Sequence, residues 1–192
     1  LFIAFAVCGQ AQGEFVVQIN PVTGEITKTG PPINGVEYIY ADDRALDENS
    51  GTFFFPSALP TKSIFQIKLA DGNTVSSPPS NNLSFYQFDN STGKFYGIDR
   101  DFVTDTKFLV EINPGTGATT VLGPTQLQSI ATFSGGFSTF DETNHRFIFL
   151  GPPDILFTLN ATDGSIIFSP NLTLGADESM VNFAYANTSN TL

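Results

Sequence analysis

Apolar and polar residues alternate along short stretches of this chain, and turn-forming residues bound each stretch. In the segment 16–20, Val17 and Ile19 point to one side of an extended backbone while Gln18 points to the other. This period of two predicts a half-buried β-strand. No stretch of ten or more residues shows helical periodicity, so the pattern predicts an all-β protein.

The same strand-and-turn pattern occurs four times, and its copies align without gaps. The copies are VVQINPVTG (16–24), IFQIKLADG (64–72), LVEINPGTG (109–117) and LFTLNATDG (156–164). Their final glycines, Gly24, Gly72, Gly117 and Gly164, are separated by 48, 45 and 47 residues. We expect these glycines to close the turn, because glycine adopts a positive φ without penalty. A fixed period of this length indicates a repeat architecture.

A second motif, an acidic turn followed by an aromatic strand, recurs between these copies. It reads LDENSGTF (46–53), FDNSTGKF (88–95) and FDETNHRF (140–147), with a weaker fourth copy at YANTSNTL (185–192). One aspartate recurs in the first three copies: Asp47, Asp89 and Asp141. An Asp side chain can accept hydrogen bonds from backbone N–H groups further along a turn. We therefore expect these aspartates to have a structural role rather than a catalytic one.

The two motifs together predict four strands in each repeat. Second strands are expected over 25–29, 73–77, 118–122 and 165–168, and third strands over about 36–41, 83–88, 131–140 and 181–186. Aromatic fourth strands begin at Phe53, Phe95 and Phe147. Proline-containing connectors follow the second strands, and we expect these prolines to end the strands because proline lacks a backbone donor.

Four antiparallel strands every ~47 residues are typical of a β-propeller blade. The Ile-Asn-Pro-x-Thr-Gly turn resembles the I-D-P-x-T-G turn of several extracellular and periplasmic propeller families. That resemblance implies a fold and no particular function. We expect an all-β, β-propeller-like protein with four repeats, forming either a four-bladed ring or a fragment of a larger propeller. A β-sandwich or a β-solenoid is the alternative fold.

The first eleven residues allow two interpretations. Leu1 to Val7 is an apolar run followed by small residues, a pattern typical of the hydrophobic region of a secretory signal. The same segment also aligns with the aromatic fourth strand of the repeat, so it can supply a closing strand from the N-terminus. We therefore expect residues 1–11 to be a signal remnant or a closing strand, and residues 12–192 to be propeller repeats.

The charge balance excludes some classes of partner. Lys and Arg number 8 against 19 Asp and Glu, which gives a net charge of −11 and a pI of about 4.2. A nucleic-acid-binding protein needs a basic face, so we expect no nucleic-acid partner. No apolar segment approaches the ~20 residues that span a bilayer, so we expect no membrane insertion.

Five N-x-S/T sequons, at Asn82, Asn90, Asn160, Asn171 and Asn187, are candidate glycosylation sites. These sequons are informative because the chain also begins with a signal-like segment. Together the two features favour a secreted, extracellular glycoprotein. Cys8 is the only cysteine, so an intrachain disulfide cannot form.

The most polar loop is a candidate calcium site. Asp99, Asp101 and Asp105 could supply oxygen ligands to Ca²⁺, although their spacing lacks the Gly and the terminal Glu of an EF-hand. A solvated loop is the simpler interpretation. His145, the only histidine, takes the glycine position of an acidic turn, and we expect it to be solvated. We expect no cofactor other than this calcium ion.

No catalytic signature is present, so three functional hypotheses remain open. The first is a binding or matrix module that holds a carbohydrate or protein ligand and has no chemistry of its own. The second is an extracellular hydrolase or lyase, calcium-assisted or not, with acidic residues at the mouth of the central channel. The third is a structural subunit that self-associates through an open blade edge.

Overall fold

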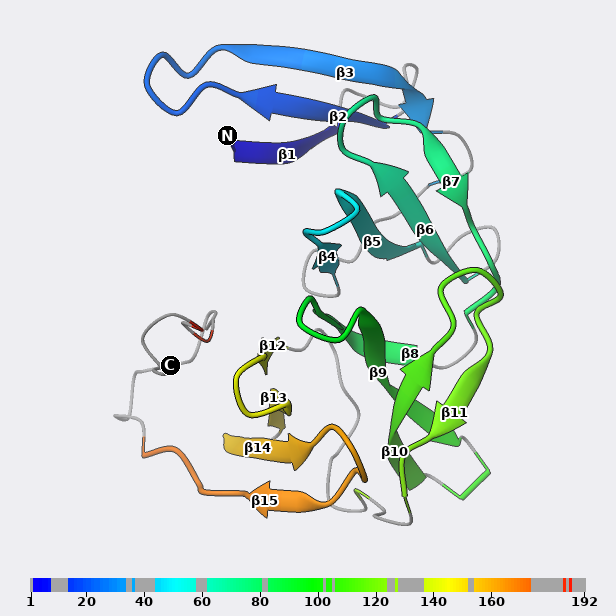
Figure 1. Cartoon of the computed structure of the whole chain (residues 1–192), viewed down its shortest axis with the longest axis vertical. Coiled ribbons are helices and arrows are strands. Elements are labelled where there is room, and N and C mark those ends of the chain that lie inside the picture. The colour runs from blue at the N-terminus through cyan, green and yellow to red at the C-terminus, as the bar shows by residue number, and fades with distance from the viewer. Residues whose placement is uncertain are drawn as a thin grey trace.

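The described residues fold into antiparallel β-sheets and contain no helix (Figure 1). The computed structural model describes residues 2–7, 14–33, 36, 44–57, 62–80, 83–101, 103–104, 106–123, 127, 137–151, 154–173, 185 and 187. Within each sheet, strands that are consecutive in the sequence pair side by side. No helix in these segments is long and apolar enough to cross a membrane.

Four sheets follow one another along the chain. Sheet A contains β1 (Phe2–Val7), β2 (Glu14–Ile19) and β3 (Ile26–Ile33). Sheet B contains β4 (Ala45–Asp47), β5 (Thr52–Ser57), β6 (Ser63–Lys68) and β7 (Thr74–Ser76). Sheet C contains β8 (Leu83–Asp89), β9 (Lys94–Asp101), β10 (Thr106–Ile112) and β11 (Thr119–Val121). Sheet D contains β12 (Ser138–Asp141), β13 (Arg146–Gly151), β14 (Ile155–Asn160) and β15 (Ile166–Phe168).

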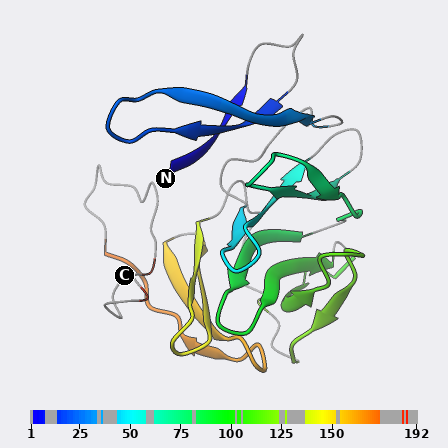
Figure 2. The ribbon, with the colours of Figure 1, turned by 45° about the horizontal axis from the view of Figure 1, so that its top comes forward.

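The sheets are arranged side by side around an arc (Figures 1 and 2). The last strand of each sheet, β3, β7, β11 or β15, lies on the outside of the arc, and β4, β8 and β12 lie on the inside (Figure 1). The inner strands are neighbours across the sheets, because β8 contacts both β4 and β12. We call the line around which the inner strands β4, β8 and β12 gather the axis.

Aromatic and aliphatic side chains fill the space between neighbouring sheets. The cluster between sheets C and D includes Phe85, Tyr96, Phe140, Phe147 and Phe149. The cluster between sheets B and C includes Phe54, Tyr86, Phe88 and Phe95, and the cluster between sheets A and B includes Val16, Ile33, Phe55 and Phe65. Full burial of one such side chain contributes about 1.5–3 kcal/mol. The phenylalanines of the aromatic strands therefore form the core between the sheets.

The four turn glycines occupy equivalent places in the structure. The φ angles of Gly24, Gly72, Gly117 and Gly164 are 72°, 69°, 73° and 68°. In each turn the glycine N–H donates to the carbonyl oxygen four residues earlier, at 2.8 Å. In the first turn, the side-chain oxygen of Asn20 also accepts from the N–H of Val22 at 2.9 Å. The motif therefore folds in the same way in all four copies.

Three of these turns also pack against the preceding sheet. A Cβ atom on Gly164 would overlap the carbonyl oxygen of Leu122, and one on Gly117 would overlap the carbonyl oxygen of Pro79. Between sheets A and B the connector residue Gly30 lies against Asp71, next to the turn glycine of sheet B. The turn motif and the connector motif, which the sequence shows as separate, therefore meet in space.

The structure differs from the sequence-based expectations at the second strand of the first repeat. The strand β3 continues through Pro31 and Pro32 to Ile33, although prolines were expected to end it. These prolines fall where the register shifts between Glu14 and Val16, and β3 is an outer strand, so the missing donor breaks no ladder bond. Of the third strand expected over about 36–41, only Val36 lies within the described residues, and the described inner strand β4 covers Ala45–Asp47.

The N-terminal segment forms a strand in the structure. All of β1 pairs with β2, from Phe2 opposite Ile19 to Val7 opposite Glu14. Of the third strand expected over 181–186, only Tyr185 lies within the described residues.

Candidate functional site

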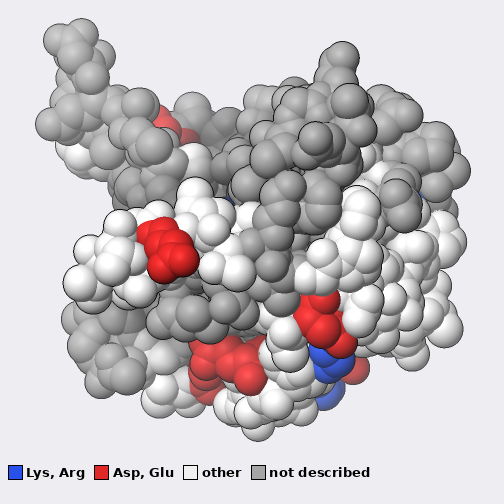
Figure 3. All heavy atoms as spheres, turned by 90° about the horizontal axis from the view of Figure 1, so that it is seen from above, with Lys and Arg blue, Asp and Glu red and all other residues white. Residues whose placement is uncertain are grey.

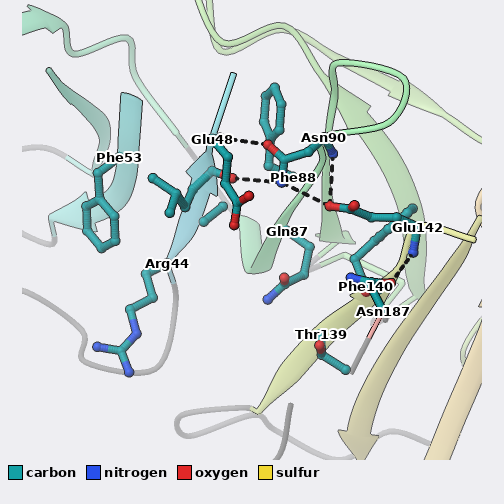
Figure 4. Close-up of a pocket in the computed structure, with 12 residues that line it drawn as sticks. Arg44, Glu48, Phe53, Gln87, Phe88, Asn90, Thr139, Phe140, Glu142 and Asn187 are labelled. Atoms are coloured by element: carbon teal, nitrogen blue, oxygen red, sulfur yellow. Dashed lines mark hydrogen bonds between the residues drawn. The ribbon is translucent and has the colours of Figure 1, made fainter. Parts of the chain in front are cut away.

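A pocket of about 290 Å³ lies on the axis, where the inner strands of sheets B, C and D meet (Figure 4). Its lining comprises Arg44, Ala45, Leu46, Glu48, Phe53, Gln87, Phe88, Asn90, Thr139, Phe140, Glu142 and Asn187. On the side of the molecule shown in Figure 3, acidic side chains are more prominent than basic ones among the described residues. The pocket lining itself carries two carboxylates, Glu48 and Glu142, and one guanidinium, Arg44. The pocket is therefore a polar, negatively charged depression with aromatic walls.

Equivalent positions of the repeats supply most of this lining. The residue before the acidic turn aspartate is Leu46, Phe88 or Phe140, and the residue after it is Glu48, Asn90 or Glu142. In the weaker fourth copy, Asn187 occupies the position that corresponds to Glu48, Asn90 and Glu142. The pocket therefore arises from the repeat itself, since each sheet turns the same two positions toward the axis.

The position after the aspartate links each unit to the one before it. The Oδ1 atom of Asn90 accepts a hydrogen bond from the N–H of Glu48 at 2.7 Å. The Oε1 atom of Glu142 accepts from the N–H of Asn90 at 3.3 Å, and Oδ1 of Asn187 accepts from the N–H of Glu142 at 2.8 Å. We call Glu48, Asn90, Glu142 and Asn187 the axial relay. Its side chains satisfy backbone donors that would otherwise lie at the pocket wall.

The amide groups of the pocket donate to neighbouring backbone. The Nδ2 atom of Asn90 donates to Glu142 Oε1 at 3.0 Å and to the Leu46 carbonyl at 3.3 Å. The Nε2 atom of Gln87 donates to the carbonyl oxygen and the hydroxyl of Ser138, at 2.9 and 3.0 Å. These bonds join sheets B, C and D around the pocket and hold its walls in place.

The recurring aspartates bond within their own turns. Asp89 accepts from the N–H groups of Ser91 and Thr92 and from both hydroxyls. Asp47 accepts from Ser50, and Asp141 accepts from Asn144 in the equivalent way. None of the three aspartates lines the pocket.

His145 is exposed, as expected, and it also reaches the neighbouring sheet. Its Nδ1 atom lies 3.1 Å from Oδ2 of Asp89, which is fully buried. Burial raises the pKa of the Asp89 carboxyl, but hydrogen bonds from Ser91, Thr92 and His145 outweigh burial and hold the pKa below its usual value. This contact bridges sheets C and D beside the axial relay.

A buried tyrosine lies close to the same carboxylate. Burial, followed by the negative charges of Asp89 and Glu111, raises the pKa of Tyr96 to about 12. Its ring stacks on Phe140 of sheet D at 5.3 Å between ring centroids. Tyr96 therefore remains neutral and serves the core between the sheets.

Two of the candidate calcium ligands, Asp99 and Asp101, lie on β9 and differ in their local bonding. Asp101 accepts from the N–H of Val103 at 2.8 Å and from the hydroxyl of Thr104 at 2.8 Å, which lowers its pKa. Asp99 lies on β9, where burial raises its pKa. Asp105 lies outside the described residues. In the described part of the chain, no three His, Cys, Asp or Glu residues are grouped to hold a metal ion.

The Asn residues of the described sequons differ in their exposure and in their hydrogen bonds. The amide nitrogens of Asn90 and Asn187 donate inside the protein, the latter to the Phe140 carbonyl at 3.3 Å. Asn160 accepts from the N–H of Thr162, whereas Asn171 is exposed. Asn82 lies outside the described residues. Asn171 is thus the described sequon best placed to accept a glycan.

Sequence reasoning missed the pocket residues Glu48 and Glu142. A signal was available, because a residue with a carboxylate or amide oxygen follows the turn aspartate in three copies of the motif and occupies the same position, as Asn187, in the fourth. That regularity indicates a shared role, but the sequence does not show that the position faces an axis.

No family model matches the sequence, and no curated protein matches it. Solved structures of β-propellers do resemble its fold. A chain of the nidogen/laminin complex aligns with a TM-score of 0.56 at 17% identity, covering 79% of this chain and 54% of that one. The β-propeller domain of Swd1 from Myceliophteria thermophila gives a TM-score of 0.52 at 14% identity, covering 84% of this chain and 52% of that one.

A third neighbour is TolB from Acinetobacter baumannii, with a TM-score of 0.52 and 10% identity, covering 83% of this chain and 38% of that one. The present chain therefore spans about half or less of the length of these neighbours. At such identities the likeness concerns the fold alone. Together with the three four-stranded antiparallel sheets, it shows that this chain has the architecture of a β-propeller.

Proposed function

We propose that this chain is part of a secreted or cell-surface interaction module that binds its ligand at the axial pocket and carries out no chemistry of its own. The observation that supports this function is the composition of the pocket, to which three sheets and Asn187 contribute side chains at equivalent positions. Hydrogen bonds between the sheets fix those side chains before any ligand arrives, which lowers the entropic cost of binding.

Secretion is supported by sequence and surface features. The apolar N-terminal run, the strongly acidic composition and the exposed sequon at Asn171 are all compatible with an extracellular protein. One structural neighbour was solved as part of the nidogen/laminin complex, and binding of another protein is the function we propose for this chain too.

The pocket can be tested by filling it. Glu48 is exposed at the pocket, so Glu48→Trp should place an indole ring there without disturbing the core. Glu25→Trp, at the exposed turn between β2 and β3, is the matched control. We expect Glu48→Trp to abolish capture of an extracellular partner and Glu25→Trp to leave it intact. Equal capture by both variants would contradict a binding site at the axis.

A hydrolase or lyase is a second candidate, favoured by the presence of Glu48 and Glu142 in one pocket. Two carboxylates that flank a substrate can act as acid and base in glycoside hydrolysis. Turnover of a polysaccharide or ester by the purified chain, lost in Glu142→Gln, would establish this function in place of the first.

Self-association is a third hypothesis. Within the described segments, β1 forms one edge of the three-stranded sheet A, and such an edge can pair with another chain. Size-exclusion chromatography at dilute concentration tests this hypothesis, because a monomer there would reject it.

A further inference from the structure

The hydrogen-bond donors and acceptors of the axial pocket are unevenly used. The amide nitrogens of Gln87, Asn90 and Asn187 all donate to protein oxygens, so their N–H groups are engaged within the wall. Oxygen atoms are left over, because a carboxylate accepts at both oxygens and an amide oxygen has two lone pairs. Apart from the Arg44 guanidinium, which extends away from the two glutamates, the pocket is therefore richer in available acceptors than in available donors.

Glu48 is the clearest of these acceptors. At the equivalent positions, the side chains of Asn90, Glu142 and Asn187 each accept a backbone N–H from the preceding unit. No such bond is present for the Glu48 carboxylate among the described residues, and its side chain is exposed at the pocket (Figure 4). Glu48 therefore carries the same kind of acceptor as the rest of the axial relay, but its carboxylate accepts no hydrogen bond from a described residue.

Glu142 adds a second carboxylate to the same space. Its Oε1 atom accepts from Asn90, while its Oε2 atom has no bond to another described residue. Asn90 lies between the two glutamates, and Figure 4 shows Arg44 extending away from both. The lining contains two carboxylates and one guanidinium, so its net charge is negative.

The lining, the charge and the size of the pocket restrict the kind of ligand that it can bind. Phe88 and Phe140 line the pocket with buried rings that stack on Phe54 and Tyr96, so the negative charge of the lining is what favours a cation over an anion. A volume of about 290 Å³ lies at the lower end of the ~300–1,000 Å³ typical of small-ligand pockets. This volume suits one long side chain better than an oligosaccharide. The charge of −11 on the whole chain would also attract a basic partner.

We propose that the axial pocket binds a Lys or Arg side chain of a partner protein, with its ammonium or guanidinium group held between Glu48 and Glu142. The cation supplies the N–H donors that the Glu48 carboxylate lacks, and charge-assisted bonds of this kind are about twice as strong as neutral ones. This inference rests on the proposed function, which it deepens by naming the chemistry of the ligand.

Small probes can test the proposal without knowledge of the partner. Agmatine carries a guanidinium and an ammonium group at the two ends of a four-carbon chain, whereas n-butylurea has a neutral urea on a chain of the same length and carries neither charge. We expect isothermal titration at low ionic strength to show binding of agmatine, weakened by added salt, and no binding of n-butylurea. Glu48→Gln and Glu142→Gln, which keep the shape of the side chain, should each weaken agmatine binding about tenfold or more, the loss expected for one charge-assisted hydrogen bond.

The control variant is Glu25→Gln, which removes the same charge from an exposed turn outside the pocket. It should leave agmatine affinity unchanged, and unfolding curves should show that all three variants are folded. Equal binding of agmatine and n-butylurea, or an equal loss in Glu25→Gln, would overturn the proposal.

A further probe separates this proposal from the proposed function. Binding of N-acetylglucosamine in place of agmatine, lost in Glu48→Trp, would reject a cationic ligand while keeping the pocket as a binding site. Failure of every probe, with partner capture unaffected by Glu48→Trp, would reject both.

Discussion

The contacts between neighbouring sheets differ between the outer rim of the molecule and its axis. At the outer rim, backbone packs on backbone, as where Gly164 of sheet D lies against the carbonyl oxygen of Leu122. At the axis, side-chain oxygens accept hydrogen bonds from backbone N–H groups. Asn90 accepts from the N–H of Glu48, and Glu142 accepts from the N–H of Asn90.

This difference explains which positions vary between the repeats. The turn residue is glycine in all four copies because the turn requires a positive φ, and at Gly117 and Gly164 the outer contact also leaves no room for a Cβ atom. The axial contact needs only an oxygen acceptor of suitable reach, and Glu and Asn both supply one. The repeat is therefore uniform where sterics decide and variable where hydrogen bonding decides.

The largest effect is expected at the outer rim. Gly164→Ala adds a Cβ atom that overlaps Leu122 and also forces alanine to adopt a positive φ. We expect a loss of about 3 kcal/mol or more in the free energy of unfolding. Gly24→Ala is the matched control, because Gly24 has a similar φ but nothing within 4 Å of the added atom, and it should cost only about 1 kcal/mol. Urea unfolding of both variants measures the difference, and equal losses would show that the outer contact contributes nothing.

The next effect concerns the contact between Asp89 and His145, beside the axial relay. The folded protein holds the pKa of Asp89 below its usual value of 3.8. The carboxylate therefore contributes stability above about pH 4, and this contribution is lost as the pH falls through the folded-state pKa. Asp89→Asn should lower the free energy of unfolding at pH 7 by about 1–3 kcal/mol and make stability less sensitive to acid.

Urea titrations between pH 2.5 and 7 test the Asp89 prediction. Glu25→Gln removes an exposed carboxylate as the control. If the free energy of unfolding falls equally steeply with decreasing pH in Asp89→Asn and in the parent chain, this carboxylate has no role in acid stability.

A smaller effect is expected within the axial relay. Asn90→Ala removes the acceptor for Glu48 and the donor to Glu142, which should cost about 1–2 kcal/mol. Glu142→Gln keeps the acceptor for the N–H of Asn90, so the loss should stay within about 0.5 kcal/mol. Equal destabilisation by both variants would mean that charge, and not the acceptor alone, is required at this position.

The smallest effect on stability is expected from glycosylation. Asn171 is exposed, whereas the amide nitrogen of Asn90 donates within the axial relay. Mass spectrometry of glycopeptides from secreted protein should find a glycan at Asn171 and none at Asn90. Thr173→Ala, which destroys the sequon at Asn171, should remove that glycan and leave the unfolding curve unchanged. A glycan at Asn90 would show that the axial contact opens before the protein is secreted.

The outer rim was more predictable from the sequence than the axis. Strand alternation, the positive φ of the turn glycines and the antiparallel sheets all follow from interactions between residues close in sequence. The contact between Asn90 and Glu48 joins residues 42 positions apart, and that between Asn90 and Glu142 joins residues 52 apart. Their meeting depends on the angle between sheets, which a linear motif does not encode.

His145 shows the same limit. In the sequence it is a histidine in a surface turn, and its φ of 51° fits the glycine position that it occupies. Its partner Asp89 belongs to another sheet, 56 residues away. Only the packing of sheet D on sheet C brings the imidazole to this buried carboxylate.

The amino-acid sequence by itself determined the strands, the repeat and the turns, because backbone geometry and the alternation of apolar residues act over a few neighbours. Tertiary structure decided which of the repeated residues face the axis and which acceptors there remain available to a ligand. Both depend on how whole sheets are rotated against one another, and that rotation results from the packing of aromatic side chains distributed over the entire chain.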